Sequence, residues 1–147
     1  MYMINVRDYG AIGNGLTKDT LSIQNAIDAC AATGGGTVYF PAGIYLSGTL
    51  RLKSNITLFI DSGATLLGSR EVEDYQGLQR FGDYAGYKGM KDFDTALLLG
   101  ENIHNAAIVG HGTIDGNKVF NRKTVEDMRG PHAILIDTCQ KILIRDI

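Results

Sequence analysis

The chain has 147 residues, 44% of them hydrophobic, and its 14 basic and 16 acidic residues give a net charge of -2. This near-neutral balance argues against the strongly basic surfaces that bind nucleic acid or anionic membranes, and we expect neither partner. The longest apolar runs are far too short to cross a bilayer. We interpret residues 1–147 as the N-terminal part of a single domain that is truncated at its C-terminal end.

The first elements are a short strand and one helix. Alternate apolar residues predict the opening strand, namely Ile4, Val6 and Tyr9. A helix is predicted near residues 20–33 because apolar residues recur on one face, at Ile23, Ala26, Ile27 and Cys30. Asp19 or Thr20 can cap its start, and Gly34 ends it.

Three glycines before this helix, Gly10, Gly13 and Gly15, raise the question of a phosphate-binding loop. A P-loop needs Gly-Lys followed by Ser or Thr, whereas Leu16 follows Gly15. A dinucleotide-binding fold also needs alternating strands and helices, which are missing here. We therefore exclude a nucleotide site.

Short strands separated by Gly, Asn and Asp follow the helix. They are predicted at residues 37–40, 49–52, 56–60, 64–67, 97–100, 106–109, 133–136 and 141–144. One template, a polar residue followed by alternate apolar positions, recurs in Asn55-Ile56-Thr57-Leu58, Asn105-Ala106-Ala107-Ile108 and Lys141-Ile142-Leu143-Ile144. Leu97-Leu98-Leu99-Gly100 likewise matches Ile134-Leu135-Ile136-Asp137.

Repeated strands of this kind favour a coil wound onto itself, in which identical rungs stack and alternate side chains share one interior. A β-sandwich also has short strands and Gly turns, but it does not favour one template that recurs after insertions of different length. The predicted fold class is therefore all-β: a parallel β-helix, or solenoid, with one N-terminal capping α-helix.

Further motifs carry a family resemblance. They are Asp8-Tyr9-Gly10-Ala11, Gly34-Gly35-Gly36-Thr37-Val38, Pro41-Ala42-Gly43, Gly110-His111-Gly112-Thr113-Ile114-Asp115-Gly116, Arg129-x-Pro131 and Cys139-x-Lys141-Ile142-x-Ile144. This set resembles the N-terminal portion of glycoside hydrolase family 28, the polygalacturonases and rhamnogalacturonan hydrolases of the pectin-degrading right-handed β-helix superfamily. The resemblance covers nearly the whole chain.

The resemblance implies a hydrolase of pectic polysaccharides that needs no metal or organic cofactor. Such an inverting enzyme uses two carboxylates, and the family's catalytic motifs lie downstream of Ile147. We therefore expect the parent protein to be an enzyme and the 147-residue chain alone to be inactive. Two alternatives stay open: a non-catalytic glycan-binding or tailspike-like module, and a β-eliminating lyase of the pectate lyase type.

Two insertions break the winding, Arg70 to Asp94 and Asn117 to Gly130. The first holds five of the twelve aromatic residues, Tyr75, Phe81, Tyr84, Tyr87 and Phe93, and is interpreted as a lid, with sugar stacking as the alternative. The second holds the candidate substrate-binding residues Lys118, Arg122, Lys123 and Arg129, whose charges suit galacturonate carboxylates; a hydrated loop is the alternative.

Other conspicuous side chains have structural interpretations. His111 imitates a catalytic histidine motif but fits a turn, and Asp115 before Gly116 is typical of a side chain that holds a turn. Asp92 and Asp94 could form an acid pair or bind a cation, but a solvated loop is the preferred interpretation. Cys30 and Cys139 are expected to be small buried residues, without a disulfide or a metal.

The two ends of the sequence give weaker expectations. Ile142, Ile144 and Ile147 fall near a solenoid edge without a cap, which predicts self-association there. No signal peptide is visible at the start, which fits a cytoplasmic protein or an incomplete N-terminus of a secreted one.

Overall fold

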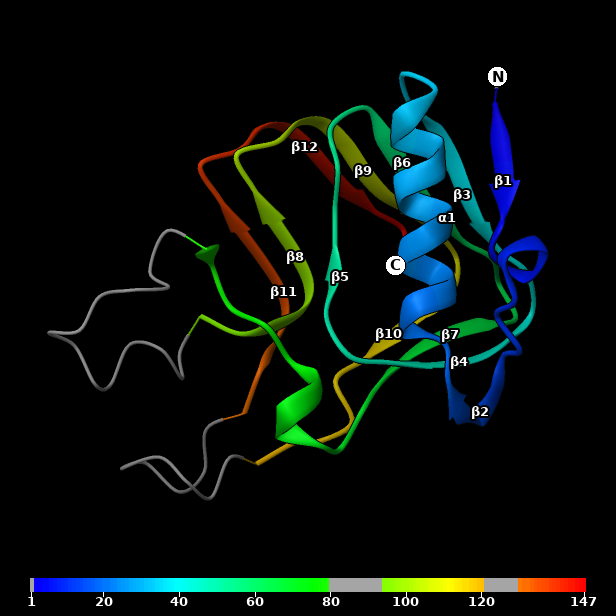
Figure 1. The fold of residues 1–147 in the computed structure, drawn as a ribbon, viewed down its shortest axis with the longest axis vertical. Helices are drawn as coiled ribbons and strands as arrows, with labels where there is room; N and C mark the ends of the chain where they lie inside the picture. Colours follow the sequence, from blue (N-terminus) through cyan, green and yellow to red (C-terminus); the bar gives the residue numbers. More distant parts are fainter. Residues whose placement is uncertain (1, 80–93, 121–129) are drawn as a thin grey trace, which may run out of the picture.

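The computed structural model describes residues 2–79, 94–120 and 130–147. The chain winds as a right-handed parallel β-helix with three sheets (Figure 1), which confirms the predicted fold class. Sheet A contains β1 (Met3–Asn5), β3 (Gly36–Phe40), β6 (Ile56–Ile60), β9 (His104–Gly110) and β12 (Gln140–Arg145). Sheet B contains β2 (Asn14–Lys18), β4 (Gly43–Ser47), β7 (Ala64–Gly68) and β10 (Thr113–Asp115). Sheet C contains β5 (Leu50–Arg51), β8 (Ala96–Glu101) and β11 (His132–Asp137).

The rungs of sheet A stack in the register that the repeated template predicts. Every pair of neighbouring strands in this sheet is parallel, and one inward row runs through Ile4, Val38, Leu58, Ile108 and Ile144. The first four of these side chains are buried, whereas Ile144, on the last strand, is 45% exposed. Alternate residues of each strand therefore build one continuous core along the axis of the coil.

The second predicted match is wrong by one residue. Ile134 pairs with Leu98, not with Leu97, and Ile136 pairs with Gly100. The cause is that Leu97, Leu98 and Leu99 are all buried. A strand that is covered on both faces has no polar and apolar alternation, so its register cannot be read from hydrophobicity.

The first residue of the template has a structural role at the turn from sheet C to sheet A, which we call the C–A corner. Asn55, Asn105 and Lys141 there have φ values of 63°, 53° and 56°. This left-handed conformation is accessible to asparagine and unfavourable for lysine. The asparagines also stack, because Asn105 Nδ2 donates to Asn55 Oδ1 at 3.4 Å.

Helix α1 (Thr20–Ala32) lies beside β5, where it protects the open edge of sheet C (Figure 1). The Gln24 side chain does this by bonding Arg51: the Arg51 backbone nitrogen donates to Gln24 Oε1 at 2.8 Å, and Gln24 Nε2 donates to the Arg51 carbonyl at 3.1 Å. Thr20 Oγ1 accepts from the Gly48 backbone nitrogen at 2.9 Å. The predicted capping helix is therefore confirmed. Its side chains bond backbone groups at the edge of sheet C that a neighbouring strand would otherwise bond.

The prediction that the Asp19 side chain caps the helix is wrong. Asp19 occupies the N-cap position but makes no capping hydrogen bond with its side chain. Its carboxylate instead accepts from the backbone nitrogens of Ile12 and Gly13, at 2.8 and 2.9 Å. The buried Asp19 thus organises the glycine-rich turn rather than the helix.

Several local elements differ from the sequence prediction, among them β10 and η2 (Val72–Asp74), which were not predicted. Val6–Tyr9 is a 3₁₀-helix, η1, because Asn5 Oδ1 accepts from the Arg7 backbone nitrogen and Gly10 has a φ of 97°. Strand β2 was not predicted, since its side chains are mostly exposed and show no alternation. Strand β4 was also missed, although Tyr45 at its centre is buried.

No helix in the described ranges is both long enough and apolar enough to span a membrane. Both cysteines are free. The predicted burial is confirmed for Cys30 and is wrong for Cys139. Cys139 is partly buried. At the last strand, β12, Leu143 and Ile144 are almost half exposed.

The Gln24 contacts can be tested with Gln24→Ala. This change leaves two backbone groups of Arg51 without their partner, and we expect a loss of about 1–2 kcal/mol in the free energy of unfolding. Urea unfolding followed by circular dichroism measures it. Asn25→Ala is the matched control, because Asn25 is an exposed amide side chain on the same helix. Equal stability of the two variants would contradict the role of Gln24.

The strained corner gives a second prediction. Lys141→Asn should raise the free energy of unfolding by roughly 0.5–1 kcal/mol, because asparagine adopts a left-handed conformation at lower cost than lysine. Gln140→Asn is the control, since residue 140 lies in strand β12 and is not among the residues with positive φ. A stabilisation of similar size in both variants would show that the effect is not conformational.

Candidate functional site

Both insertions leave the coil at the turn from sheet B to sheet C, which we call the B–C corner. Residues 69–95 join β7 to β8, and residues 116–131 join β10 to β11. In the preceding coil, Gly48 and Thr49 alone make the same turn. Because β7 pairs with β10 and β8 pairs with β11, the two insertions start side by side and return side by side. The B–C corner is therefore the candidate site.

The start of the first insertion is fixed to strand β2 by a lysine. Lys18 Nζ lies 2.6 Å from Glu71 Oε2 and 2.8 Å from Asp74 Oδ2. Burial alone would raise the pKa of the Asp74 carboxyl, but hydrogen bonds from Lys18 and Ser69 hold it below its usual value. The same carboxylates raise the pKa of Lys18. The 3₁₀-helix η2 (Val72–Asp74) is thus held against the β-helix by charge.

Neutral contacts fix the next part of this insertion. The Tyr75 hydroxyl donates to the Ser69 carbonyl at 2.6 Å, and burial raises the pKa of Tyr75 to about 12. Thr49 Oγ1 accepts from the Gln76 backbone nitrogen at 2.7 Å and donates to the Ala96 carbonyl at 2.6 Å. One threonine thus ties both ends of the insertion to the previous coil.

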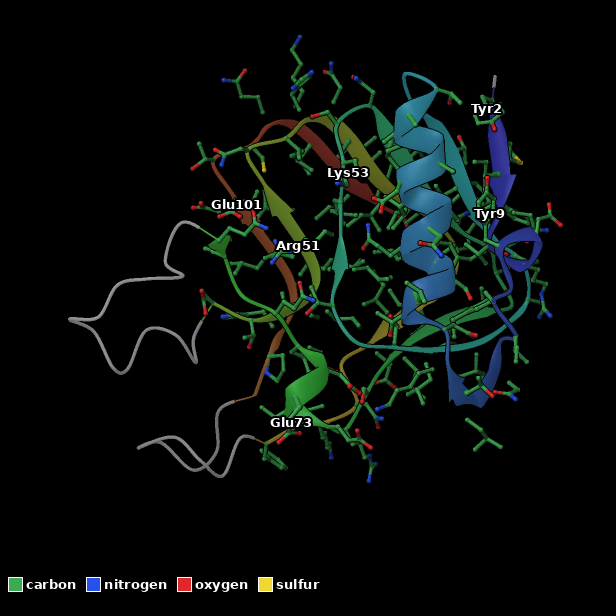
Figure 2. All side chains as sticks on the ribbon, viewed as in Figure 1. Tyr2, Tyr9, Arg51, Lys53, Glu73 and Glu101 are labelled. Carbon is green, nitrogen blue, oxygen red and sulfur yellow. The ribbon has the colours of Figure 1, made fainter. Side chains whose placement is uncertain are left out.

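An arginine completes this anchoring on the sheet C side. Arg51 donates to the Gln76 side chain at 3.1 Å and to the Gly77 carbonyl at 2.8 Å. Its guanidinium lies 4.0 Å from Glu101, whose carboxylate also accepts from the Gln79 backbone nitrogen. Figure 2 shows Arg51 and Glu101 close together, with Glu73 near the bottom of the same side. The described start of the first insertion, residues 69–79, is therefore held in place by contacts with earlier coils and with β8.

Asn117 joins the two insertions to each other. Its backbone nitrogen donates to Asp115 Oδ1 at 2.8 Å, and its Nδ2 donates to the Gly68 carbonyl at 2.9 Å. Arg70 Nε lies 3.3 Å from Asn117 Oδ1. Sequence reasoning missed the roles of Asn117 and Arg70. The only signal in the sequence was that both residues come just after the ends of the paired strands β7 and β10.

The outer face of sheet B next to this corner has uncharged side chains between two charged ones, Lys18 on β2 and Asp115 on β10. Register places Ile44, Thr65 and Thr113 in one row, and Leu46, Leu67 and Asp115 in the next. Their neighbours Tyr45 and Leu66 point inward and are buried. The corner therefore borders a regular surface of threonine and aliphatic side chains on a rigid support.

Of the four candidate substrate-binding residues, the structure describes Lys118 alone. Lys118 is exposed, with a φ of 48°, directly after Asn117. Arg122, Lys123 and Arg129 lie outside the described residues. Of the five aromatic residues in the first insertion, Tyr75 is described and is buried, while the other four lie outside the described ranges.

The structural interpretation of the other conspicuous residues can be compared with their contacts. His111 is exposed between Gly110 and Gly112, and a Cβ at either glycine would overlap Ile60. Asp115 accepts from the Asn117 backbone nitrogen, as a turn residue does. The solvated-loop interpretation is wrong for Asp94, which is buried and accepts from the Leu78 backbone nitrogen at 3.0 Å. Asp92 lies outside the described residues.

No group of three or more His, Cys, Asp or Glu side chains within the described ranges is arranged to hold a metal ion.

Comparison with known proteins gives a family. The model of the family described as rhamnogalacturonase A/epimerase, pectate lyase-like, matches residues 3–144. The exo-poly-alpha-D-galacturonosidase of Dickeya chrysanthemi is 40% identical over 119 residues, which are 78% of this chain and 19% of that protein. The mannuronan C5-epimerase AlgE1 of Azotobacter vinelandii is 32% identical over 165 aligned positions, which cover 97% of this chain and 12% of the epimerase.

Solved structures agree with the sequence comparison. The family 28 exopolygalacturonase of Yersinia enterocolitica superposes with a TM-score of 0.63 and 38% identity, over 78% of this chain and 20% of that chain. The chain thus spans about a fifth of the length of these two galacturonan-degrading proteins.

The Lys18–Asp74 contact predicts a pH-dependent stability. A lowered carboxyl pKa contributes stability above the unfolded value, about 3.9 for aspartate, and this contribution is lost as the pH falls through the lower pKa of the folded state. Asp74→Asn should therefore lose about 1 kcal/mol at pH 7, discounted for partial exposure, and the difference from the wild type should shrink below pH 4.

Urea unfolding at pH 7, 5 and 3 measures this difference. Glu71→Gln is the control, because it removes the same formal charge from a side chain that is 65% exposed, and its effect should be smaller. A difference between wild type and Asp74→Asn that persists unchanged at pH 3 would contradict the assignment.

Proposed function

Because the chain belongs to the rhamnogalacturonase A/epimerase, pectate lyase-like family, we propose that it supplies the first coils of a pectin-degrading hydrolase and binds a pectic polysaccharide there. The observation that carries this proposal is the B–C corner, where two insertions leave neighbouring coils beside a regular outer face of sheet B. A rigid coil with long loops at one corner provides an extended surface of the kind that a polymer needs.

Galacturonan is the proposed substrate class. Two of the compared proteins are named for their action on galacturonan. Each sugar residue of galacturonan carries a carboxylate. The second insertion holds the proposed substrate-contacting cations Lys118, Arg122, Lys123 and Arg129. Positive side chains beside this surface suit a chain of regularly spaced carboxylates.

The proposed chemistry of the whole enzyme is inverting hydrolysis. It needs an acid and a base about 6.5–9.5 Å apart with a water between them. Two described carboxylates at the candidate site are engaged in structural contacts. Asp74 bonds Lys18 and Ser69, and Asp115 accepts a hydrogen bond from the Asn117 backbone nitrogen. Asp61, at the far end of sheet B, accepts from the Tyr39 hydroxyl at 2.6 Å and from Ser62. We therefore propose that this chain contributes binding and that the catalytic pair is supplied elsewhere in the enzyme.

The test is binding and turnover with the 147-residue chain. We expect it to bind polygalacturonate in isothermal titration calorimetry and to release no reducing ends. Methyl-esterified pectin and unsubstituted dextran serve as comparison polymers. Absence of binding to every pectic polymer would refute the proposal.

Other outcomes would assign the chain to a different class. Hydrolysis of polygalacturonate by this chain would place the catalytic carboxylates within it and contradict the proposed division. An unsaturated product that forms only with calcium would indicate a lyase instead.

A further inference from the structure

Most cations in the described ranges already have strong partners. Lys18 is held by two carboxylates, Lys53 lies 3.6 Å from Asp28, and Arg145 lies 3.1 Å from Asp146. Arg7 donates to two backbone carbonyls, and Arg51 donates to Gln76 and Gly77 beside Glu101. Four of the described Lys and Arg side chains have no carboxylate partner: Arg7, Arg70, Lys118 and Lys141. The last three of these also lack the two backbone carbonyl contacts that hold Arg7.

Two of these three cations lie at the B–C corner and are linked by one residue. Arg70 Nε donates to Asn117 Oδ1 at 3.3 Å, and Lys118 follows Asn117 in the chain. This contact occupies Nε and leaves the two terminal nitrogens of the guanidinium without a described partner. Terminal guanidinium nitrogens match both oxygens of a carboxylate.

Asn117 is firmly held. Its Nδ2 donates to the Gly68 carbonyl at 2.9 Å and its backbone nitrogen donates to Asp115. Asn117 and Lys118 have consecutive left-handed φ values of 60° and 48°. A left-handed lysine is conformationally unfavourable, so the surrounding contacts must hold the backbone at Lys118 in place.

The nearby acidic side chains form no described ion pair with these two cations. Glu71 and Asp74 are bound to Lys18, and Asp115 bonds the Asn117 backbone. Glu73 belongs to the same 3₁₀-helix η2 and lies near the bottom of the view in Figure 2. The described contacts therefore leave the charged ends of Arg70 and Lys118 able to form an ion pair with an added carboxylate.

We propose that Arg70 and Lys118 form a binding site for the free carboxylate of one uronate residue in the polysaccharide, with Asn117 as the positioning residue. This inference rests on the proposed function and adds which chemical group is recognised and by which side chains. The site distinguishes a free uronate from its methyl ester, because esterification removes the charge and one strong acceptor oxygen.

The experiment compares binding of polygalacturonate and of highly methyl-esterified pectin by titration calorimetry at two salt concentrations. Arg70→Gln and Lys118→Gln should each weaken polygalacturonate binding by about threefold to tenfold at low salt. Their affinity for the methyl ester should stay unchanged. The salt dependence of the remaining polygalacturonate binding should decrease, because one ion pair is lost.

Two further variants separate charge from geometry. Arg70→Lys keeps the charge and loses the paired nitrogens, so it should bind between wild type and Arg70→Gln. Asn117→Gly removes the side-chain amide, while glycine still tolerates the left-handed backbone at this position. This variant should weaken polygalacturonate binding as much as Arg70→Gln does. Adding Lys118→Gln to Asn117→Gly should weaken binding by the same factor as Lys118→Gln does in the wild type. Lys141→Gln, an unpaired cation at the C–A corner, is the control and should bind like wild type.

The outcomes distinguish the two proposals. If the wild type binds polygalacturonate and Arg70→Gln and Lys118→Gln bind it equally well, the uronate site is refuted and the proposed function stands. Equal losses in Lys141→Gln would also refute it, because the effect would then be general charge. If the wild type binds no pectic polymer, the proposed function fails and the site fails with it.

Discussion

The structure depends on the in-register stacking of one coil on the next. Each strand satisfies its backbone groups with the strands above and below it, so every coil must repeat the path of its neighbour. The C–A corner enforces this repetition, since Asn55, Asn105 and Lys141 take the same left-handed conformation in successive coils. Insertions are tolerated only where they leave this path and rejoin it in register. Both insertions do so at the B–C corner, between the ends of β7 and β10 and the starts of β8 and β11.

Stacking leaves the first strand of sheet C, β5, without a strand on one side, and helix α1 lies there. At sheet C, α1 replaces the missing strand with side-chain groups, since Gln24 offers both a donor and an acceptor to Arg51, as a backbone amide would. Strand β12 ends sheet A with Leu143 and Ile144 almost half exposed.

The same support determines what the B–C corner can do. Lys18, Thr49 and Arg51 belong to earlier coils, and each bonds the start of the first insertion. Asn117 then links this insertion to the second one through Gly68 and Arg70. Binding groups that are held in this way lose less conformational freedom on contact with a ligand. Relatives of this family include a galacturonosidase and an epimerase, which fits a scaffold whose chemistry is set by the side chains it carries.

The sequence by itself determined the all-β coil, its N-terminal α-helix and the register of sheet A. The reason for the register is that the template of a polar residue followed by alternate apolar ones repeats a physical requirement of each rung. It also placed Lys118 at the candidate site. Only the tertiary structure decided the register of β8 and β11, since a strand buried on both faces has no alternation. The same holds for the partners of Asp19 and Asp94 and for the pairing of Arg70 with Asn117. These contacts join residues from different coils or turns, and local sequence patterns carry no information about which polar groups stacking brings together.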